Sequence, residues 1–426
     1  MRSKQVLRLC AGALIISVSV GAADAWAEDE YASNTHPTSS TLDLTALVLP
    51  SGELLSAQIV KDPLQPNRWG VWTATLGDQG IRSNITPIRE TTLSPFGFTS
   101  VAYFKGRVVV GQQWRSQDPF SGPVVCERYL LPAATTVWSE GGFSGCGNLV
   151  ATPDGVFSSK GGALRVMDAE GQLLPGATMP PLEPVPYGFV SVYKSFRGQA
   201  GHFLSEHFGE APPVSWAVSL FGPDGTLAAD VSGEGLPRPL KLIHADGTLT
   251  VVEEFTTQPG IRVFKRFGIG GALLSSQRFD FALVSQICSA YGGTIAHAIR
   301  HPSPSMLYWL GDDGSSRLFA ATPMTFTCHN GAVFAIRRDA SVRQLVRYRE
   351  DGTEQWVRDL PQHEVEHELG TMLAENRVIA VSSWFAEPPG GATYVRRVQR
   401  FKLDGNLLSD HVLRAPEFPI QVSSFE

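Results

Sequence analysis

After its first 27 residues the sequence lacks an apolar run long enough to cross a membrane, and it lacks the lysine-rich clusters that a basic face would need. The 426 residues include 35 Lys and Arg against 41 Asp and Glu, which gives a formal net charge of −6 at pH 7. Binding to nucleic acid or to an anionic membrane surface requires a basic face. The sequence therefore argues against a nucleic-acid partner and against a membrane-spanning protein.

Helical periodicity is also scarce. No segment carries apolar residues at positions i, i+3, i+4 and i+7 over three turns with capping residues at its ends. Only residues 363–375 are a candidate for a short helix. This shortage favours an all-β protein.

The N-terminus has the features of a secretory signal peptide. A basic start (residues 2–8) precedes an apolar run (9–20), and small residues at 25–27 mark a cleavage site before Glu28. We therefore expect residues 1–27 to be removed and the protein to be exported, to the periplasm or the extracellular space. Cleavage removes three basic residues and one acidic residue, so the formal charge becomes −8. Residues 28–41 are polar and are expected to form a disordered, mobile tail.

Short strand-like runs separated by turn residues make up the rest of the chain. Residues 324–360 contain four such runs in succession, with turns at Asn330-Gly331 and Asp351-Gly352. In these turns we expect two-residue hairpins, in which both central residues take positive φ. Looser copies of the same unit recur at intervals of 39 to 55 residues, and their first strands are expected near Leu42, Gly97, Gly147, Gly188, Leu240, Ser285, Met324 and Gly370.

A four-stranded unit that repeats at this interval is typical of a propeller blade. We therefore predict that residues 42–426 form a single all-β domain, a β-propeller of eight four-stranded blades, or of seven if the first unit is partial. A further strand is expected at 420–425, where it would help to close the ring. A β-helix would need shorter repeats, and a two-sheet sandwich would not account for eight similar units.

The repeats resemble those of bacterial PQQ-like and related β-propellers. In those families a blade ends in a turn followed by a strand that often carries a tryptophan, as in Asp351-Gly352-Thr353-Glu354-Gln355-Trp356. The resemblance is one of architecture and covers most of the chain. Such families include dehydrogenases and scaffolds of membrane assembly, so the resemblance does not imply one function. No cofactor is expected.

Four cysteines remain after the signal peptide, and an even number in an exported chain indicates two disulfides. We expect the pairs Cys126–Cys146 and Cys288–Cys328, because each pair falls in neighbouring repeats. Buried free thiols are the alternative. No CxxC motif is present, so a cysteine zinc site is not indicated.

In a propeller, the loops between the second and third strands and the loops between blades emerge on one face. Aromatic, cationic and acidic side chains that converge there could bind a small polar ligand. The candidates for ligand binding are Trp114, Arg115, His207, Arg300, His301, Arg338 and Trp384.

One motif carries a specific chemistry. His363-Glu364-Val365-Glu366-His367 matches H-E-x-x-H, in which two histidines one helical turn apart bind zinc. The longer metzincin pattern would require a third histidine at position 373, where this chain has Leu373. A divalent metal bound by His363 and His367 is one hypothesis, and a polar loop between blades is the other.

Two functions are compatible with these observations. The first is an exported binding or scaffold protein that recognises a protein partner or a small polar ligand on the loop face. The second is an exported enzyme, a hydrolase or lyase, that uses His, Arg and Glu residues of the same face, with or without a metal. His244 and His297 fall inside strand-like runs and are interpreted as core or channel residues.

Overall fold

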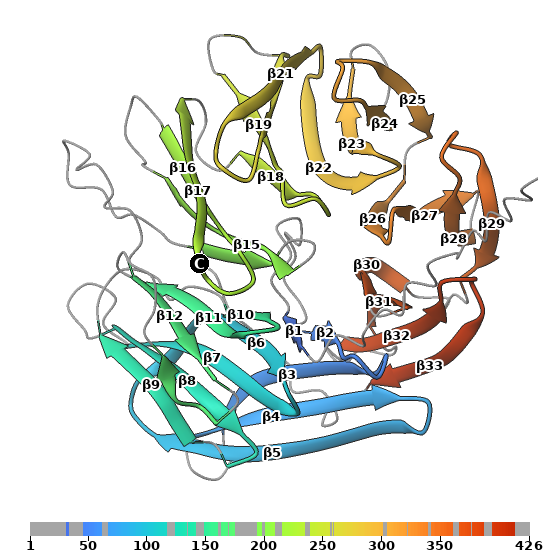
Figure 1. Ribbon diagram of the computed structural model, residues 1–426. Helices are drawn as coiled ribbons and strands as arrows, with labels where there is room; N and C mark the ends of the chain where they lie inside the picture. Colours follow the sequence, from blue (N-terminus) through green and yellow to red (C-terminus); the bar gives the residue numbers. More distant parts are fainter. Residues whose placement is uncertain are drawn as a thin grey trace, which may run out of the picture.

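The computed structural model describes the blades and most of their turns (Figure 1). The described residues are 31–33, 46–61, 67–116, 124–133, 135–141, 149–160, 163–168, 170–174, 194–197, 201–208, 215–234, 239–255, 258, 260–300, 305–321, 323–339, 342–360, 366–375, 377–386 and 394–413. All regular structure in these ranges is β-strand, and no helix long and apolar enough to span a bilayer occurs among them. The strands form eight antiparallel sheets.

The first four sheets follow one another along the chain. Blade 1 consists of β2 (Ala46–Val48), β3 (Leu54–Lys61), β4 (Arg68–Gly77) and β5 (Gly80–Glu90). Blade 2 consists of β6 (Ser94–Phe104), β7 (Arg107–Arg115), β8 (Val124–Leu131) and β9 (Thr135–Gly141), with β1 (Tyr31–Ser33) added to β6. Blade 3 consists of β10 (Leu149–Thr152), β11 (Gly155–Lys160), β12 (Ala163–Met167) and β13 (Leu173–Leu174). Blade 4 consists of β14 (Lys194–Arg197), β15 (Phe203–Phe208), β16 (Ser215–Phe221) and β17 (Leu227–Glu234).

The second half repeats this order. Blade 5 consists of β18 (Leu240–Ile243), β19 (Leu249–Glu254), β20 (Arg262–Phe267) and β21 (Leu273–Phe279). Blade 6 consists of β22 (Leu283–Ala290), β23 (Gly293–Ile299), β24 (Ser305–Leu310) and β25 (Ser316–Ala320). Blade 7 consists of β26 (Thr325–His329), β27 (Ala332–Asp339), β28 (Val342–Tyr348) and β29 (Glu354–Asp359). Blade 8 consists of β30 (Glu366–Glu375), β31 (Val378–Ala386), β32 (Tyr394–Lys402) and β33 (Leu407–Leu413).

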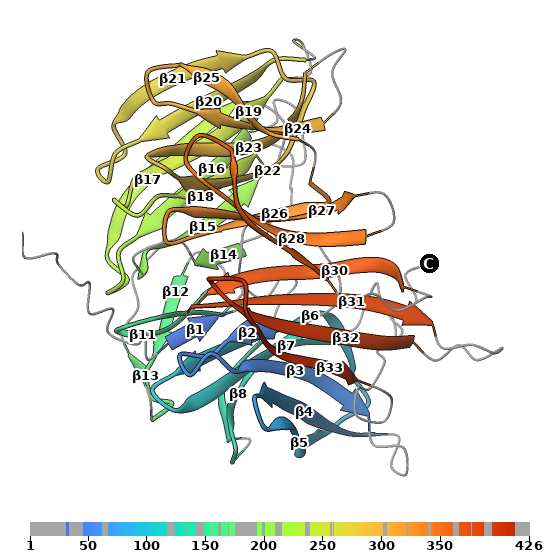
Figure 2. The same cartoon turned by 90° about the vertical axis from the view of Figure 1, so that its right-hand side faces the viewer.

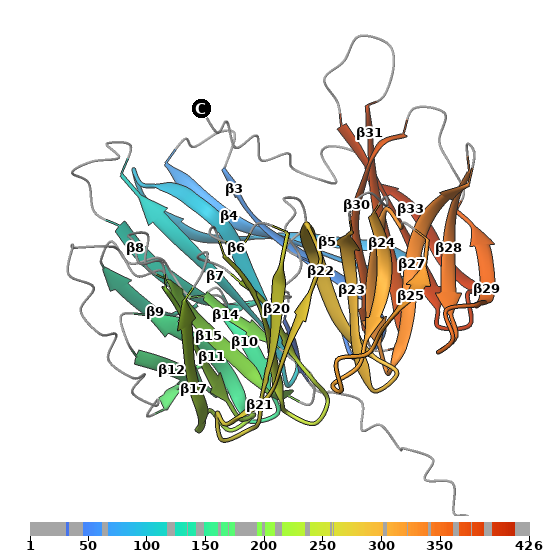
Figure 3. The ribbon, with the colours of Figure 1, turned by 90° about the horizontal axis from the view of Figure 1, so that it is seen from above.

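The predicted β-propeller of eight blades is therefore confirmed. The four main strands of every blade come from one continuous stretch of chain, β1 is the one strand added to a blade from elsewhere in the described sequence, and the first strands begin within six residues of the predicted positions. Figure 2 shows the last blade lying alongside the first, and Figure 3 shows the sheets of blades 6, 7 and 8 standing face to face. The strands of a blade alternate in direction. The turns that join its first strand to its second, and its third to its fourth, therefore lie at one end of the ring, which we call the lower end. The loops between the second and third strands, and the connections to the next blade, lie at the other end, which we call the upper end.

The hydrophobic core consists of eight clusters, and each cluster lies between two neighbouring blades. The cluster that contains Phe281 and Tyr308 joins blades 5 and 6, and the cluster that contains Phe326 and Val333 joins blades 6 and 7. Another cluster joins blade 8 to blade 1 and so closes the ring. Arg400 reinforces this closure, because its buried guanidinium donates through Nε to the carbonyl of Gly52 (3.1 Å) and through Nη1 to Asp78 (3.0 Å).

Two details of the prediction differ from the structure. Tyr31–Ser33 belongs to the segment expected to be a disordered tail, but it forms β1 and pairs with Ala102–Phe104 of β6. The candidate helix at 363–375 is wrong, because residues 366–375 form strand β30, paired with β31. A strand lets Met372 and Ala374 pack into the cluster between blades 7 and 8. Residues 1–27 and the strand expected at 420–425 lie outside the described residues.

The two kinds of glycine turn also differ. At Asn330-Gly331 both residues have positive φ (48° and 71°), as predicted for a two-residue hairpin. At Asp351-Gly352 only the glycine does, with φ of 83°. The aspartate instead accepts hydrogen bonds from the backbone N–H (2.8 Å) and the hydroxyl (2.6 Å) of Thr353, and the following strand carries a β-bulge. A carboxylate that caps the turn replaces the second positive φ.

One predicted disulfide is confirmed. Cys288 of β22 and Cys328 of β26 are bonded, with their Cα atoms 5.7 Å apart, and they join the innermost strands of blades 6 and 7. Cys126 is buried in β8 and is also disulfide-bonded. Cys146 lies outside the described residues, so the pairing of Cys126 with Cys146 stays a prediction.

Candidate functional site

The predicted ligand-binding residues lie on five blades. All of those described occur toward the upper end of a second strand or directly after it: Trp114 and Arg115 in β7, His207 in β15, Arg300 after β23, Arg338 in β27 and Trp384 in β31. His301 lies outside the described residues, and so do the side chains of His207 and Trp384. The topology therefore places these positions at one end of the ring, but spread around it.

Trp114 has no exposed surface. Its indole Nε1 donates to the hydroxyl of Tyr129 (3.0 Å), and that hydroxyl donates to the carboxylate of Glu127. Arg89 of blade 1 completes the network with an ion pair to Glu127 (2.5 Å) and a position over the Trp114 ring. Burial raises the pKa of Tyr129 well above its usual value, so the phenol stays protonated. Trp114 joins blades 1 and 2 and offers no surface to a ligand.

The three predicted arginines, Arg115, Arg300 and Arg338, differ in exposure. Arg300 is half-buried, and its guanidinium lies over the rings of Phe281 (5.1 Å) and Tyr308 (5.4 Å). Arg338 is exposed on β27, and Arg115 is half-buried at the end of β7. Of the three, Arg300 lies closest in sequence to the polar cluster described next.

The metal hypothesis stays a prediction. His363 lies outside the described residues, and His367 lies in strand β30, without a described side chain. Within the described ranges, no group of three His, Cys, Asp or Glu side chains could hold a metal ion. The helix that brings the two histidines of an H-E-x-x-H motif together is not formed by residues 366–375.

An open polar cluster lies at the upper end of blade 6. The ring of His297 is placed between two serine hydroxyls: Nδ1 lies 2.9 Å from Oγ of Ser285, and Nε2 contacts Oγ of Ser305. These residues come from three adjacent strands, β23, β22 and β24. Ser285 is exposed, whereas His297 and Ser305 are half-buried. We call these three residues the Ser285 cluster.

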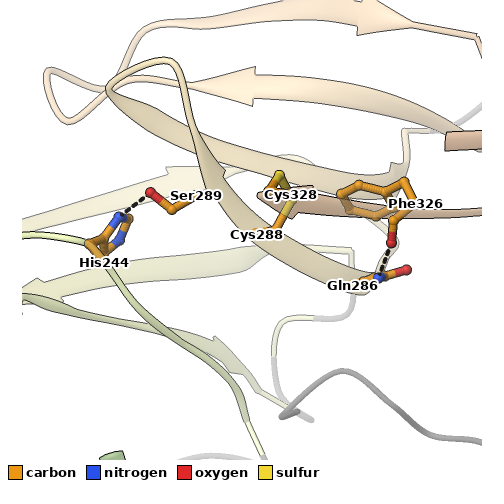
Figure 4. The surroundings of a disulfide bond; sticks show 6 residues. All are labelled: His244, Gln286, Cys288, Ser289, Phe326 and Cys328. Carbon is orange, nitrogen blue, oxygen red and sulfur yellow. Dashed lines mark hydrogen bonds between the residues drawn. A yellow bond between two sulfur atoms is a disulfide. The ribbon is translucent and has the colours of Figure 1, made fainter. Parts of the chain in front are cut away.

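The position of Ser285 results from a β-bulge. Val284 pairs with Ala298 and Gln286 pairs with His297, so Ser285 is the extra residue between two regular pairs. A bulge turns a side chain away from the direction that strand alternation would give it. The neighbouring backbone is held firmly, because Gln286 Nε2 donates to the carbonyl of Phe326 in blade 7 (2.6 Å) and Cys288 is bonded to Cys328 (Figure 4).

The electrostatics of His297 favour a neutral ring. Burial lowers the pKa of His297 below its usual value of about 6.5. In the tautomer that carries its proton on Nε2, the ring donates to Ser305 and accepts at Nδ1 from the hydroxyl of Ser285. A neutral imidazole that accepts from an exposed serine is the arrangement of a general base beside a nucleophile.

A second histidine, His244, directly follows β18 of blade 5 and lies between two hydroxyls, one of them at the lower end of β22. His244 Nδ1 lies 3.0 Å from Oγ of Ser289, and Nε2 lies 2.7 Å from Oγ1 of Thr250 (the Ser289 contact is drawn in Figure 4). His244 is only 4% exposed. Burial, and then the charge of Arg266, lower the pKa of His244 to about 4. It is a core histidine, as the sequence suggested.

Near His244 is a small hollow, open to solvent, between blades 5 and 6, lined by Arg266, Asp312, Gln277 and Phe264 among others. The Arg266 guanidinium forms ion pairs with Asp246 (2.8 Å) and with Asp312 of the next blade. Its Nε donates to Thr248 (2.9 Å). These side chains bind one another, so the ion pairs of Arg266 link blade 5 to blade 6.

Ser285 and Ser305 carry no recognisable sequence signal. Twelve residues separate Ser285 from His297, and no nucleophile motif surrounds either serine. Only the pairing of β22 with β23, together with the bulge, brings Ser285 close to His297. A serine near a predicted strand histidine was the one available hint, and it is too common to be specific.

No protein-family model matches the chain, and no curated protein matches its sequence. Solved structures similar to it include an acylaminoacyl peptidase from Pyrococcus horikoshii, with 8% identity and a TM-score of 0.43, covering 71% of this chain and 50% of that chain. Others are the Dos1 propeller (11% identity, TM-score 0.39, covering 63% and 83%) and TolB from Acinetobacter baumannii (12% identity, TM-score 0.25, covering 74% and 65%). This chain thus spans half the length of the Pyrococcus peptidase.

These similarities are too distant to inform function. The propeller architecture implied by the resemblance to PQQ-like repeat proteins is confirmed by the eight sheets themselves. No comparison points to the PQQ-like families in particular.

Proposed function

We propose that the protein is an exported β-propeller that binds a small polar ligand at the upper end of blade 6. The observation that carries this proposal is the exposed hydroxyl of Ser285 on a braced bulge of β22, held by His297 of the neighbouring strand β23. A hydroxyl and an imidazole provide hydrogen bonds, which suit a ligand that carries hydroxyl, carboxylate or carbonyl groups.

Two features support export. The first 27 residues have the basic, apolar and small-residue order of a signal peptide. A disulfide between neighbouring blades persists in an oxidising compartment.

The proposal can be tested with a panel of sugars, amino acids, dicarboxylates and ester-bearing metabolites, screened for an increase in the melting temperature of the mature protein. A ligand that binds the folded state stabilises it by mass action. Ser285→Arg should abolish the shift by filling the site. Leu318→Arg is the matched control, because Leu318 is 58% exposed on β25, the outer strand of the same blade. Ligand binding that survives Ser285→Arg unchanged would place the site elsewhere, and a panel without any binder would count against a small-ligand function.

A further inference from the structure

We propose that Ser285 is a nucleophile activated by His297 and that it reacts with carboxylic esters. This inference rests on the proposed ligand site, because the ester would bind at the same corner of blade 6. It goes further by assigning a covalent reaction to one residue.

The geometry provides a nucleophile, a base and an orienting group. Ser285 Oγ lies 2.9 Å from Nδ1 of His297, which is within reach for proton transfer. Ser305 contacts the opposite ring nitrogen and restrains the orientation of the ring. The three groups lie on adjacent strands of one sheet, so their spacing does not depend on a loop.

Exposure separates this cluster from an ordinary buried histidine. Four residues further along β22, Ser289 forms a similar contact with His244, but that ring is only 4% exposed. Ser289 is half-buried and its histidine partner lies in the core, so an ester has less access to this pair than to Ser285. Ser285 is exposed, and the bulge turns it out of the regular strand pairing. The two serines therefore form an internal pair of test and control on a single strand.

The reaction balances with the ester and water alone. The proton of Ser285 moves to Nδ1 of His297 as Oγ bonds to the ester carbonyl carbon. The bond from that carbon to the leaving oxygen then breaks, and the leaving alcohol takes the proton from His297. This leaves an acyl group on Ser285. Water, with His297 again as the base, releases the acid and restores the serine.

The orienting group restricts the range of esters. In serine hydrolases a carboxylate stabilises the imidazolium that forms during the reaction, whereas Ser305 supplies only a neutral hydroxyl. The protonated ring is therefore less stabilised, and the nucleophile is weaker. We expect reaction with esters of acidic alcohols such as phenols, whose leaving groups need little help, and no cleavage of amides.

The test is labelling of the mature protein with a fluorophosphonate probe, followed by identification of the modified peptide by mass spectrometry. Wild-type protein should be labelled at Ser285, and His297→Gln should lower the labelling rate about 100-fold, as expected on loss of a general base. Ser285→Ala should abolish labelling, whereas Ser289→Ala should leave it unchanged. Circular dichroism melting shows whether each variant is folded.

Absence of labelling in folded wild-type protein would overturn the inference, as would labelling that His297→Gln does not slow. These outcomes are distinguishable from failure of the ligand site. If a polar ligand still stabilises the wild-type protein and Ser285→Arg removes that effect, the binding proposal stands without the nucleophile. If labelling occurs but no ligand binds, the reactive serine stands and the binding function fails.

Discussion

His244 and His297 lie in similar surroundings and have opposite access to solvent. Each ring is placed between two hydroxyls, and in each case one hydroxyl comes from β22: Ser289 at the lower end of the strand and Ser285 at the upper end. The lower ring is buried between blades 5 and 6, beside the ion pairs of Arg266. The upper ring faces blade 7 and reaches solvent through Ser285.

The difference shows that in this propeller the polar contacts of Arg266 that hold blades 5 and 6 together and the proposed site lie at opposite ends of the ring. At the lower end, side chains of adjacent blades satisfy one another, as in the contact of Arg266 with Asp312 and the donation from Arg317 to the carbonyl of Glu350. The polar groups in these contacts hydrogen-bond to one another across the blade junctions. At the upper end of blade 6, a bulge leaves one hydroxyl exposed while the backbone below it stays cross-linked.

The largest expected effect comes from the disulfide Cys288–Cys328, because Cys288 lies on β22 between Ser285 and Ser289. Replacing Cys288 and Cys328 together with alanine removes a link across 40 residues, and a chain-entropy treatment gives a loss of about 4 kcal/mol. Urea unfolding would measure this loss, and amide exchange in β22 should rise around both serines. A loss below about 1 kcal/mol would show that blade packing alone fixes this junction.

A smaller effect concerns pH and separates the two histidines. The pKa of His244 is about 4 in the folded protein and about 6.5 when unfolded, so between these values the unfolded chain binds more protons. The stabilisation is therefore fully present above pH 6.5 and is lost as the pH falls toward 4. The loss from this residue is about 3 kcal/mol.

Urea unfolding of wild type and His244→Gln at pH 7 and pH 4 would measure this contribution, because other titrating groups cancel in the difference. His297→Gln is the matched control. Burial also lowers the pKa of His297, so this residue should make the protein more stable at pH 7 than at pH 4, in the same direction as His244. We expect its effect on the unfolding free energy to be smaller, because the His297 ring is only half-buried. Equal pH dependence in wild type and His244→Gln would contradict the assignment.

The eight blades could be predicted from the sequence because their signals are local. Runs of strand residues and turns such as Asp351-Gly352 recur at a regular interval, and the four main strands of each blade come from one continuous stretch. The pair Cys288–Cys328 followed from the same repeat, because equivalent inner strands of neighbouring blades lie side by side.

The candidate site could not be predicted in the same way. A bulge at Ser285 depends on how β22 pairs with β23, and no residue type marks it. The burial of Trp114 was also hidden, because a tryptophan near a loop looks the same in sequence whether it faces a ligand or the next blade. Strand β30 was mistaken for part of a helix candidate because residues 363–367, which overlap its first two residues, match a motif typical of helices.

The smallest expected effect is the most direct comparison of the two regions, because it changes one serine at a time on the same strand. Ser289→Ala leaves Nδ1 of the buried His244 without its hydroxyl partner, which should cost about 1 kcal/mol of unfolding free energy. Ser285→Ala should change stability by less than about 0.5 kcal/mol, since water can replace an exposed hydroxyl. Urea unfolding of the two variants in parallel provides the measurement. If Ser285→Ala proves the more destabilising of the two, the upper hydroxyl is needed to hold the bulge, and its exposure does not indicate a site kept free for a ligand.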